Sequence, residues 1–212
     1  MKIFIVAIFI VAGVWYWQKG GSANDIGFDK AGKPVVVIFT INKCDPCQAA
    51  IGILQERGVP FQEKMIEPEN GQDKDAKIWR KVSNNMLPLT ISGNNKVAGS
   101  SKWELISLLG GNFGDQYLMR EERTYFGQHF DAKGSPKVVL YGTDWCPTCA
   151  ALRKEFHENG ISFVDIDVER SGEFDKLTRV MEIAGYPAIW VGYTRVHGTT
   201  LDAVKAVMNK KS

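Results

Sequence analysis

Apolar and polar positions follow the same pattern twice along the chain, once in each half. In the first half, an apolar run rich in β-branched residues leads through a short polar break into an amphipathic stretch. Apolar residues recurring with a period near 3.6 mark helices, and short β-branched runs mark strands. The predicted order is strand, helix, strand, helix, strand, strand and helix, at 35–41, 47–57, 61–67, 73–83, directly after Pro88, after the turn 93–95, and at 100–109. This alternation predicts an α/β fold in which a mixed sheet carries helices on its faces.

The second half repeats the first in register. Residues 28–34 match residues 130–136 at a spacing of 102, and both Cys-x-x-Cys pairs keep this spacing. Around Pro88 and Pro187 the spacing is 99, which places a gain or loss of three residues between the copies. Helices are expected near 149–158, 172–183 and 199–209. A register kept over this length predicts an internal duplication, and therefore two tandem domains of one fold.

The duplication and the loops between its copies predict the domain boundaries. We expect the first domain at 27–112, a connector at 113–127 and the second domain at 128–212, after a separate segment at 1–23. The connector has room for a short helix at 115–123.

The first 23 residues have the pattern of a targeting segment. Lys2 precedes an uncharged apolar run from Ile3 to Val14, which is followed by the aromatic residues 15–17 and the small residues 21–23. This predicts a signal anchor with an aromatic belt, or a cleaved signal peptide; a buried soluble helix is the third interpretation, because the run is shorter than the ~20 residues of a usual membrane helix. We expect a membrane-anchored protein with its domains outside the cytoplasm, in a bacterial periplasm, or a secreted protein if the signal is cleaved.

Composition narrows the function classes. The chain has 212 residues and a formal net charge of +2, which argues against nucleic acid or another acidic polymer as a partner. All four cysteines fall in the two Cys-x-x-Cys pairs. A disulfide scaffold would spread its cysteines along the chain, so these cysteines indicate chemistry rather than stapling.

Both Cys pairs open a predicted helix directly after a predicted strand. The segments are Lys43-Cys44-Asp45-Pro46-Cys47 and Trp145-Cys146-Pro147-Thr148-Cys149. A helix start offers free backbone N–H groups and the positive end of the helix dipole, which favour a thiolate on the first cysteine. The second cysteine is close enough to close a disulfide and release a bound partner. This predicts dithiol–disulfide exchange at two sites, in a fold that keeps Cys146 open to solvent and near Cys149 and Pro187.

These features resemble the glutaredoxin branch of the thioredoxin-like superfamily. The resemblance rests on the strand, Cys-x-x-Cys and helix order, on a proline before the third strand of each copy, and on a Gly-containing turn before the last helix. It implies that Pro88 and Pro187 are cis and lie beside the Cys pairs, and that the backbone of Leu87 and Tyr186 holds an extended substrate. Trp145 resembles the thioredoxin pattern and is expected to shield the site or contact substrate.

Departures from the family pattern bear on glutathione. Glutathione-using members resemble one another in a Gly-Gly-x-x-Asp turn and in a basic residue before the first cysteine. The second copy keeps the first Gly and the Asp, which makes Thr199 and Asp202 candidate substrate-binding residues, but it has Asp144 where the cation is expected. These departures argue against glutathione as a co-substrate. No resident cofactor or metal is expected, and the partners are a disulfide-containing protein and a redox partner.

The two sites are not expected to be equivalent. Asp45 opposes a thiolate on Cys44, whereas Lys43 favours it, and the second pair has no such charge between its cysteines. We expect Cys146 and Cys149 to be the main exchange site, with Cys44 and Cys47 as a relay or a degenerate copy.

Other interpretations of the same residues remain open. Cys47 and Cys146 are 99 positions apart and fall in separate predicted domains, which argues against a zinc site within one chain and leaves a metal or iron–sulfur centre shared between chains as the rival. The whole chain also suits a non-catalytic, membrane-tethered module that binds a partner or a metal. The histidines do not recur between the copies and are expected in surface or lead-in positions, and three tryptophans are expected in packing positions. These residues are His129, His157 and His197, and Trp79, Trp103 and Trp190.

Overall fold

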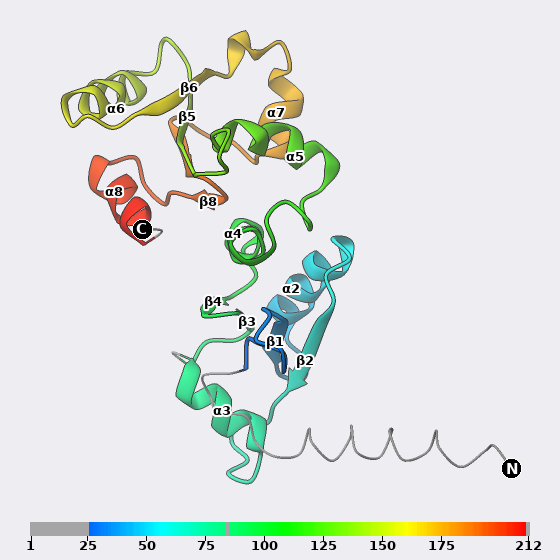
Figure 1. The fold of residues 1–212 in the computed structure, drawn as a ribbon. Coiled ribbons are helices and arrows are strands. Elements are labelled where there is room, and N and C mark those ends of the chain that lie inside the picture. The colour runs from blue at the N-terminus through cyan, green and yellow to red at the C-terminus, as the bar shows by residue number, and fades with distance from the viewer. Residues whose placement is uncertain (1–25, 84, 211–212) are drawn as a thin grey trace, which may run out of the picture. The chain divides into compact units, whose positions relative to one another are not determined.

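The computed structural model describes residues 26–83 and 85–210, which form two four-stranded sheets (Figure 1). The strand orders are β2-β1-β3-β4 and β6-β5-β7-β8. The predicted fold class, two tandem α/β domains of thioredoxin-like type, is confirmed. The predicted targeting segment at 1–23 lies outside the described residues. Of the helices that are described, none combines the length and the apolar character that crossing a membrane requires.

Contacts group the chain into two compact units. Among the described residues, one unit comprises 26–43, 61–83 and 85–98, and the other comprises 44–60 and 99–210. The helix that carries Cys44 and Cys47 therefore counts with the second unit by its contacts. A grouping by contacts does not test the domain boundaries expected from the sequence, which stay a prediction.

The first unit contains the first sheet and one helix on its face. The elements are β1 (Val36–Thr40), β2 (Phe61–Met65), α3 (Lys74–Val82), β3 (Leu89–Ser92) and β4 (Asn95–Ala98). Strand β1 pairs in parallel with β2 and antiparallel with β3, and β3 continues into the hairpin with β4. Ala76 and Trp79 of α3 pack with Val37, Phe39 and Ile91 of the sheet in one buried cluster. The predicted packing position of Trp79 is confirmed.

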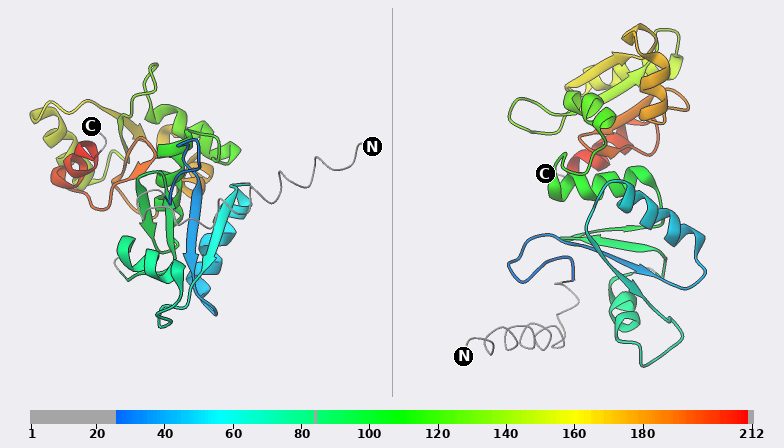
Figure 2. Two further views of the ribbon diagram at one scale, coloured as in Figure 1. Left: turned by 60° about the horizontal axis from the view of Figure 1, so that its bottom comes forward. Right: turned by 90° about the vertical axis from the view of Figure 1, so that its right-hand side faces the viewer.

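The second unit contains the second sheet and the remaining helices. Its elements are α2 (Asp45–Glu56), α4 (Lys102–Phe113), α5 (Arg120–Phe126), η1 (Gly127–His129), β5 (Val138–Gly142), α6 (Pro147–Glu158), β6 (Phe163–Asp167), η2 (Glu169–Ser171), α7 (Phe174–Val180), β7 (Ala188–Val191), β8 (Thr194–Arg195) and α8 (Leu201–Asn209). Figure 2 shows the second sheet with its helices from two further directions.

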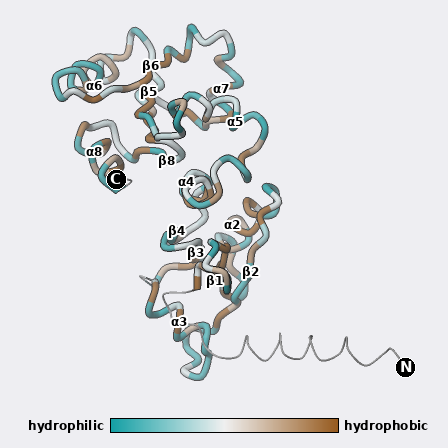
Figure 3. Tube along the Cα trace, in the orientation of Figure 1, coloured by the Kyte–Doolittle hydropathy of each residue, from teal (hydrophilic) through white to brown (hydrophobic). Residues whose placement is uncertain are grey.

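Alternation along β5 gives the second sheet two buried faces. Val138 and Leu140 pack with residues of α6 and α8, whereas Val139 and Tyr141 pack with residues of α4, α5 and α7. Successive side chains of a strand point to opposite faces, so a strand covered on both sides is apolar throughout. Figure 3 accordingly shows hydrophobic colour along β1 and β5.

The duplication predicted from the sequence recurs in the strand pairing. Val36 pairs with Phe61 and Val138 pairs with Phe163, which keeps the spacing of 102. Both copies also begin with a short bridge, between Phe28 and Pro34 and between Phe130 and Pro136. Each copy therefore forms its parallel pair and its lead-in from matched residues.

Helix α4 departs from the prediction in length. It continues through Gly110 and Gly111, where we expected it to end, and stops at Gly114 with a φ of 63°. Its buried face packs in the cluster of the second sheet, where the Trp103 ring meets the edge of Trp190 at a centroid distance of 5.8 Å. Packing of this face offsets the low helix propensity of glycine. The predicted packing positions of Trp103 and Trp190 are confirmed.

His129 lies in the lead-in to the second sheet, one of the two kinds of position expected for the histidines, and it is buried there. The side chain is 0% exposed, and its ring nitrogens lie 2.8 Å from the carbonyl oxygen of Gly192 and 2.8 Å from the hydroxyl of Tyr141. Burial lowers the pKa of His129 to about 4, although its hydrogen bond to Gly192 acts in the other direction. The imidazole is therefore a neutral core group. His157 and His197 are exposed, as expected.

Candidate active site

Both Cys pairs sit at helix starts, as their sequence setting predicts. Cys44 is the N-cap of α2 and Cys146 is the N-cap of α6, and each sulfur accepts a hydrogen bond from the backbone N–H of the second cysteine, at 3.2 Å and 3.1 Å. Pro147 occupies the first turn of α6, where the N–H that it lacks would have no helical partner. A sulfur in this position meets a backbone donor and the positive helix end, both of which stabilise a thiolate.

Each pair is joined as a disulfide. The Cα atoms of Cys44 and Cys47 are 5.2 Å apart, as are those of Cys146 and Cys149. Cys47 and Cys149 are both 0% exposed. The second cysteine of each pair is thus held inside the helix within bonding reach of the first, which is the arrangement that resolves a mixed disulfide.

Cys146, which was expected to be open to solvent, is buried. Cys146 is only 5% exposed, whereas Cys44 is half-buried. The expectation of an open Cys146 is therefore wrong for the disulfide state, in which its sulfur is bonded to the fully buried Cys149. Exposure does not support Cys146 as the more reactive of the two first cysteines.

Both prolines of the predicted sites follow a cis peptide bond. These bonds join Leu87 to Pro88 and Tyr186 to Pro187, as the resemblance implied. In the second sheet, Tyr141 at the end of β5 pairs with Ala188, so Pro187 lies next to the strand end from which the Cys146 loop leaves. In the first sheet, the matching pair is Phe39 and Leu89.

Two predicted substrate residues of the second site, Trp145 and Tyr186, contact each other through their rings. The ring edge of Trp145 meets Tyr186 at a centroid distance of 6.1 Å, and Trp145 is 65% exposed. Thr199 and Asp202 are exposed at the start of α8. Among the described residues, no hydrogen bond, ion pair or ring contact joins Thr199 or Asp202 to the Cys146 loop. The structure brings the rings of Trp145 and Tyr186 together, and a substrate-binding role of Thr199 and Asp202 stays a prediction.

A short 3-10 helix after β6 holds the loop that precedes Cys146. Trp145 Nε1 donates to Glu169 Oε1 at 3.0 Å, and Arg170 forms an ion pair with Asp144. Burial, with the nearby charges of Glu169 and Asp167, raises the pKa of Tyr186. The residues of η2 were missed from the sequence, where the charged stretch after β6 was their only signal.

Arg153 lies close to Cys149 of the second pair and was also missed in the sequence. Its guanidinium binds the carboxylate of Asp165 through two hydrogen bonds, Nε to Oδ2 at 2.8 Å and Nη2 to Oδ1 at 3.0 Å. A Cβ built on Gly142 would meet both Cys149 Sγ, at 3.0 Å, and Arg153 Nη2, at 3.2 Å. The signal in the sequence is the spacing of four between Cys149 and Arg153, which places both on one helix face.

The glutaredoxin family model matches the chain in two segments, residues 36–85 and 138–196. The chain belongs to the glutaredoxin family. A glutaredoxin of Pseudomonas aeruginosa is 34% identical over 64 residues, which is 30% of this chain and 76% of that protein. The two Cys-x-x-Cys pairs of this glutaredoxin are accordingly those of a thiol–disulfide oxidoreductase.

Two of the solved structures that match the chain do so at low identity. The holo form of glutaredoxin C1 from Populus tremula x tremuloides is 14% identical and has a TM-score of 0.33, covering 43% of this glutaredoxin and 89% of that chain. A protein disulfide oxidoreductase from Aeropyrum pernix is 13% identical with a TM-score of 0.31, covering 90% of this chain and 88% of that one.

Proposed function

We propose that this glutaredoxin exchanges disulfides with protein or small-thiol substrates, chiefly through Cys146 and Cys149. The observation that carries the exchange chemistry is the Cys146 sulfur at the start of α6, which accepts a hydrogen bond from the Cys149 N–H and is bonded to Cys149. The ranking above Cys44 rests on charge, because the first turn of α6 has no acidic residue, whereas that of α2 has Asp45. Trp145, the chain neighbour of Cys146, is 65% exposed and meets the ring of Tyr186 edge to face, so it offers aromatic surface that suits an incoming polypeptide.

The exchange proceeds in two displacements. The Cys146 thiolate attacks one sulfur of a substrate disulfide, forms a mixed disulfide with it and releases the other substrate sulfur as a thiolate. The Cys149 thiolate then attacks Cys146 Sγ, which forms the Cys146–Cys149 bond and releases the second substrate thiolate. Two electrons pass from the dithiol to the substrate, and the two protons of the dithiol end on the released thiols. The reverse sequence donates a disulfide.

The first pair has the same local geometry but different surroundings. Its helix starts with Asp45, an anion beside Cys44, and the exposed Lys43 precedes it. The cation and the anion act in opposite directions on a Cys44 thiolate. We propose that Cys44 and Cys47 are a relay partner of the second pair or a copy kept for structure.

We also propose partners and a location, the latter from the sequence pattern of residues 1–23. The substrate is a disulfide-containing protein, a second protein or small thiol restores the redox state, and no resident cofactor takes part. The turn at Thr199 and Asp202 lacks one glycine of the glutathione-binding pattern, which argues against glutathione as the reductant. The N-terminal segment anchors the protein in a membrane with its domains in the periplasm, or directs secretion if it is cleaved.

Single replacements of the first cysteines test the proposal. C146S is expected to lower insulin-disulfide reduction by at least about 100-fold, whereas C44S is expected to keep most of it, because only Cys146 forms the productive mixed disulfide. C149S should accumulate a mixed disulfide that dithiothreitol releases. Full activity in C146S would reverse the ranking of the two sites, and full activity in both single variants and in their combination would overturn the proposal.

A membrane-tethered module that binds a partner or a metal is the second candidate. The observation that favours it is the covered Cys146, since a structural cysteine needs no access. Thiol titration with and without dithiothreitol, together with metal analysis of the purified protein, separates the two. Four thiols that appear only after reduction support the oxidoreductase, and stoichiometric metal without reducible disulfides supports the module.

A further inference from the structure

The guanidinium of Arg153 lies close to the buried sulfur of Cys149. Both groups would contact a Cβ built on Gly142, at 3.2 Å for Arg153 Nη2 and 3.0 Å for Cys149 Sγ. The two atoms are therefore no more than about 6 Å apart, a separation at which a charge changes the ionisation of its neighbour. Gly142 makes this approach possible because it has no side chain.

Arg153 is held in place from two sides. Its bidentate pair with Asp165 fixes the plane of the guanidinium, and Nη1 donates to the carbonyl oxygen of Thr143 at 3.3 Å. The same carbonyl accepts from the backbone N–H of Cys146 at 3.5 Å. Arg153 therefore contacts the loop that leads into the Cys pair as well as the space beside Cys149.

The first copy lacks this cation. At the spacing of 102 that relates the copies, Arg153 corresponds to Ile51, and Gly142 corresponds to Thr40. The residue that matches Asp165 is Glu63, whose carboxylate accepts a hydrogen bond from the Thr40 hydroxyl at 2.7 Å instead of an ion pair with arginine. The two Cys pairs thus share their helix-start geometry, and the position four residues after the second cysteine is arginine in one copy and isoleucine in the other.

We propose that Arg153 is a positioning residue that stabilises the thiolate of Cys149 and makes Cys146–Cys149 the more oxidising of the two pairs. The inference rests on the proposed function. Cys149 is fully buried, and burial alone disfavours its charged form. A neighbouring cation offsets this cost in the dithiol but gains nothing in the uncharged disulfide, so it stabilises the reduced form and raises the reduction potential.

The same cation assists the resolving step. In the mixed disulfide, the Cys149 thiolate attacks Cys146 Sγ, and the substrate sulfur leaves as a thiolate with the bonding electron pair. A larger thiolate fraction on Cys149 speeds this attack, because nucleophilicity falls less steeply than the thiolate fraction rises. Two electrons then pass favourably from a Cys44–Cys47 dithiol to the Cys146–Cys149 disulfide, with two protons, either within one chain or between chains.

Charge variants in the full chain test the inference. R153I reproduces the first copy, R153K keeps the charge, and D165N removes the anion that partly offsets it. Each protein is equilibrated in buffers of reduced and oxidised dithiothreitol, trapped with an alkylating agent and digested, so that both Cys pairs are quantified in one sample. The Cys44–Cys47 pair is the internal control.

R153I should lower the equilibrium constant for reduction of Cys146–Cys149 about three- to tenfold, where tenfold corresponds to about 30 mV. R153K should stay within about twofold of the unaltered protein, and D165N should raise the constant. In the C146S background, R153I should move the alkylation of Cys149 to higher pH. A constant unchanged in R153I, or shifted in the same direction by R153I and D165N, overturns the inference. A different result tests the proposed function itself. If the Cys146–Cys149 pair of the unaltered protein does not exchange with dithiothreitol, the proposed function is wrong, and the inference that rests on it is wrong too.

Discussion

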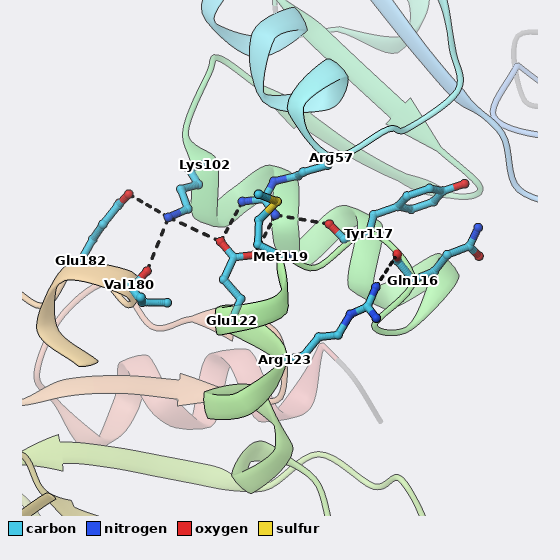
Figure 4. A network of polar contacts seen from close by, with 9 residues as sticks. All are labelled: Arg57, Lys102, Gln116, Tyr117, Met119, Glu122, Arg123, Val180 and Glu182. Atoms are coloured by element: carbon cyan, nitrogen blue, oxygen red, sulfur yellow. Dashed lines mark hydrogen bonds and ion pairs between the residues drawn. The ribbon is translucent and has the colours of Figure 1, made fainter. Parts of the chain in front are cut away.

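Arg57 and Glu122 form a bidentate ion pair that is almost completely buried. Arg57 Nη1 lies 2.7 Å from Glu122 Oε2, Nη2 lies 2.8 Å from Oε1, and the side chains are 2% and 4% exposed (Figure 4). The carboxylate also accepts from the backbone N–H of Met119 at 2.9 Å and lies 3.5 Å from Lys102 Nζ. Burial acts to raise the pKa of Glu122, but these hydrogen bonds and positive charges prevail, so its pKa lies below the usual value. The pair joins the end of α2 to the start of α5.

Removing one partner of this pair should destabilise the protein more than removing both. E122A leaves a buried guanidinium without its counter-ion, and we expect a loss of about 3–5 kcal/mol in the free energy of unfolding. The double variant R57M/E122L replaces both charges with apolar groups and should recover at least half of that loss. Urea unfolding followed by circular dichroism measures both. A loss below about 1 kcal/mol in E122A would contradict a stabilising role for the pair.

Buried His129 should make the protein sensitive to mild acid. Its pKa of about 4 in the folded protein lies below the value near 6.5 of an unfolded chain, so the unfolded state binds the proton first as the pH falls. The stability is fully present above pH 6.5 and is lost progressively as the pH falls toward 4, by roughly 3 kcal/mol in total. H129Q should lose stability at pH 7.5 but show a smaller further loss at pH 5.

Urea unfolding at pH 7.5 and pH 5 checks this expectation. The matched control is H157Q, which changes an exposed histidine on α6 and should keep the acid loss of the unaltered protein. An equal loss between the two pH values in H129Q and H157Q would show that another group is responsible. Glu122 does not interfere in this window, because its lowered pKa places its titration at more acid pH.

Local patterns in the sequence were sufficient for the repeated fold and for the helix-start position of each Cys pair. Strand and helix periodicity depends on residues that are neighbours in the chain. The spacing of 102 then relates the two copies, and the strand pairs Val36 with Phe61 and Val138 with Phe163 keep this spacing. The cis state of the two X–Pro bonds came from the resemblance to the family rather than from local patterns.

Features that depend on residues far apart in the chain could not be predicted from local sequence patterns. Helix α4 continues through two glycines because its buried face packs on the second sheet, and this contact has no local signal. The sequence around His129 predicts a loop, and its hydrogen-bond partners in the core, Gly192 and Tyr141, lie elsewhere in the chain. The position of Arg153 near Cys149 depends on Gly142 of β5, which leaves room for both side chains, and on Asp165 of β6, which binds the guanidinium. Each miss reflects packing across the chain rather than a misread pattern.

Adjacent glycines in α4 should respond in opposite ways to alanine. A Cβ on Gly110 would overlap the ring of Tyr193, whereas a Cβ on Gly111 has nothing within 4 Å. G110A should therefore destabilise the protein by about 1–3 kcal/mol through overpacking. G111A should stabilise it by about 0.5–1 kcal/mol, because alanine favours the helix over glycine. Thermal unfolding of the two variants measures the contrast, and an equal shift in both would mean that Tyr193 does not pack against this face.

The exposed indole beside Cys146 should matter for polypeptide substrates and not for small ones. Trp145 is 65% exposed and is held by its hydrogen bond to Glu169 and its edge contact with Tyr186, so it presents ordered apolar surface next to the sulfur. Loss of such an anchor costs on the order of 1–2 kcal/mol of binding. W145A should therefore lower kcat/KM about five- to thirtyfold for a disulfide-linked peptide, mainly through KM, and leave the rate with hydroxyethyl disulfide within about twofold.

The control is F174A, which removes another exposed aromatic side chain of the second unit, Phe174 on α7, 42% exposed. Peptide kinetics that match in W145A and F174A would show that the indole does not contact substrate, and a parallel fall with the small disulfide would assign Trp145 to the chemistry of Cys146 itself.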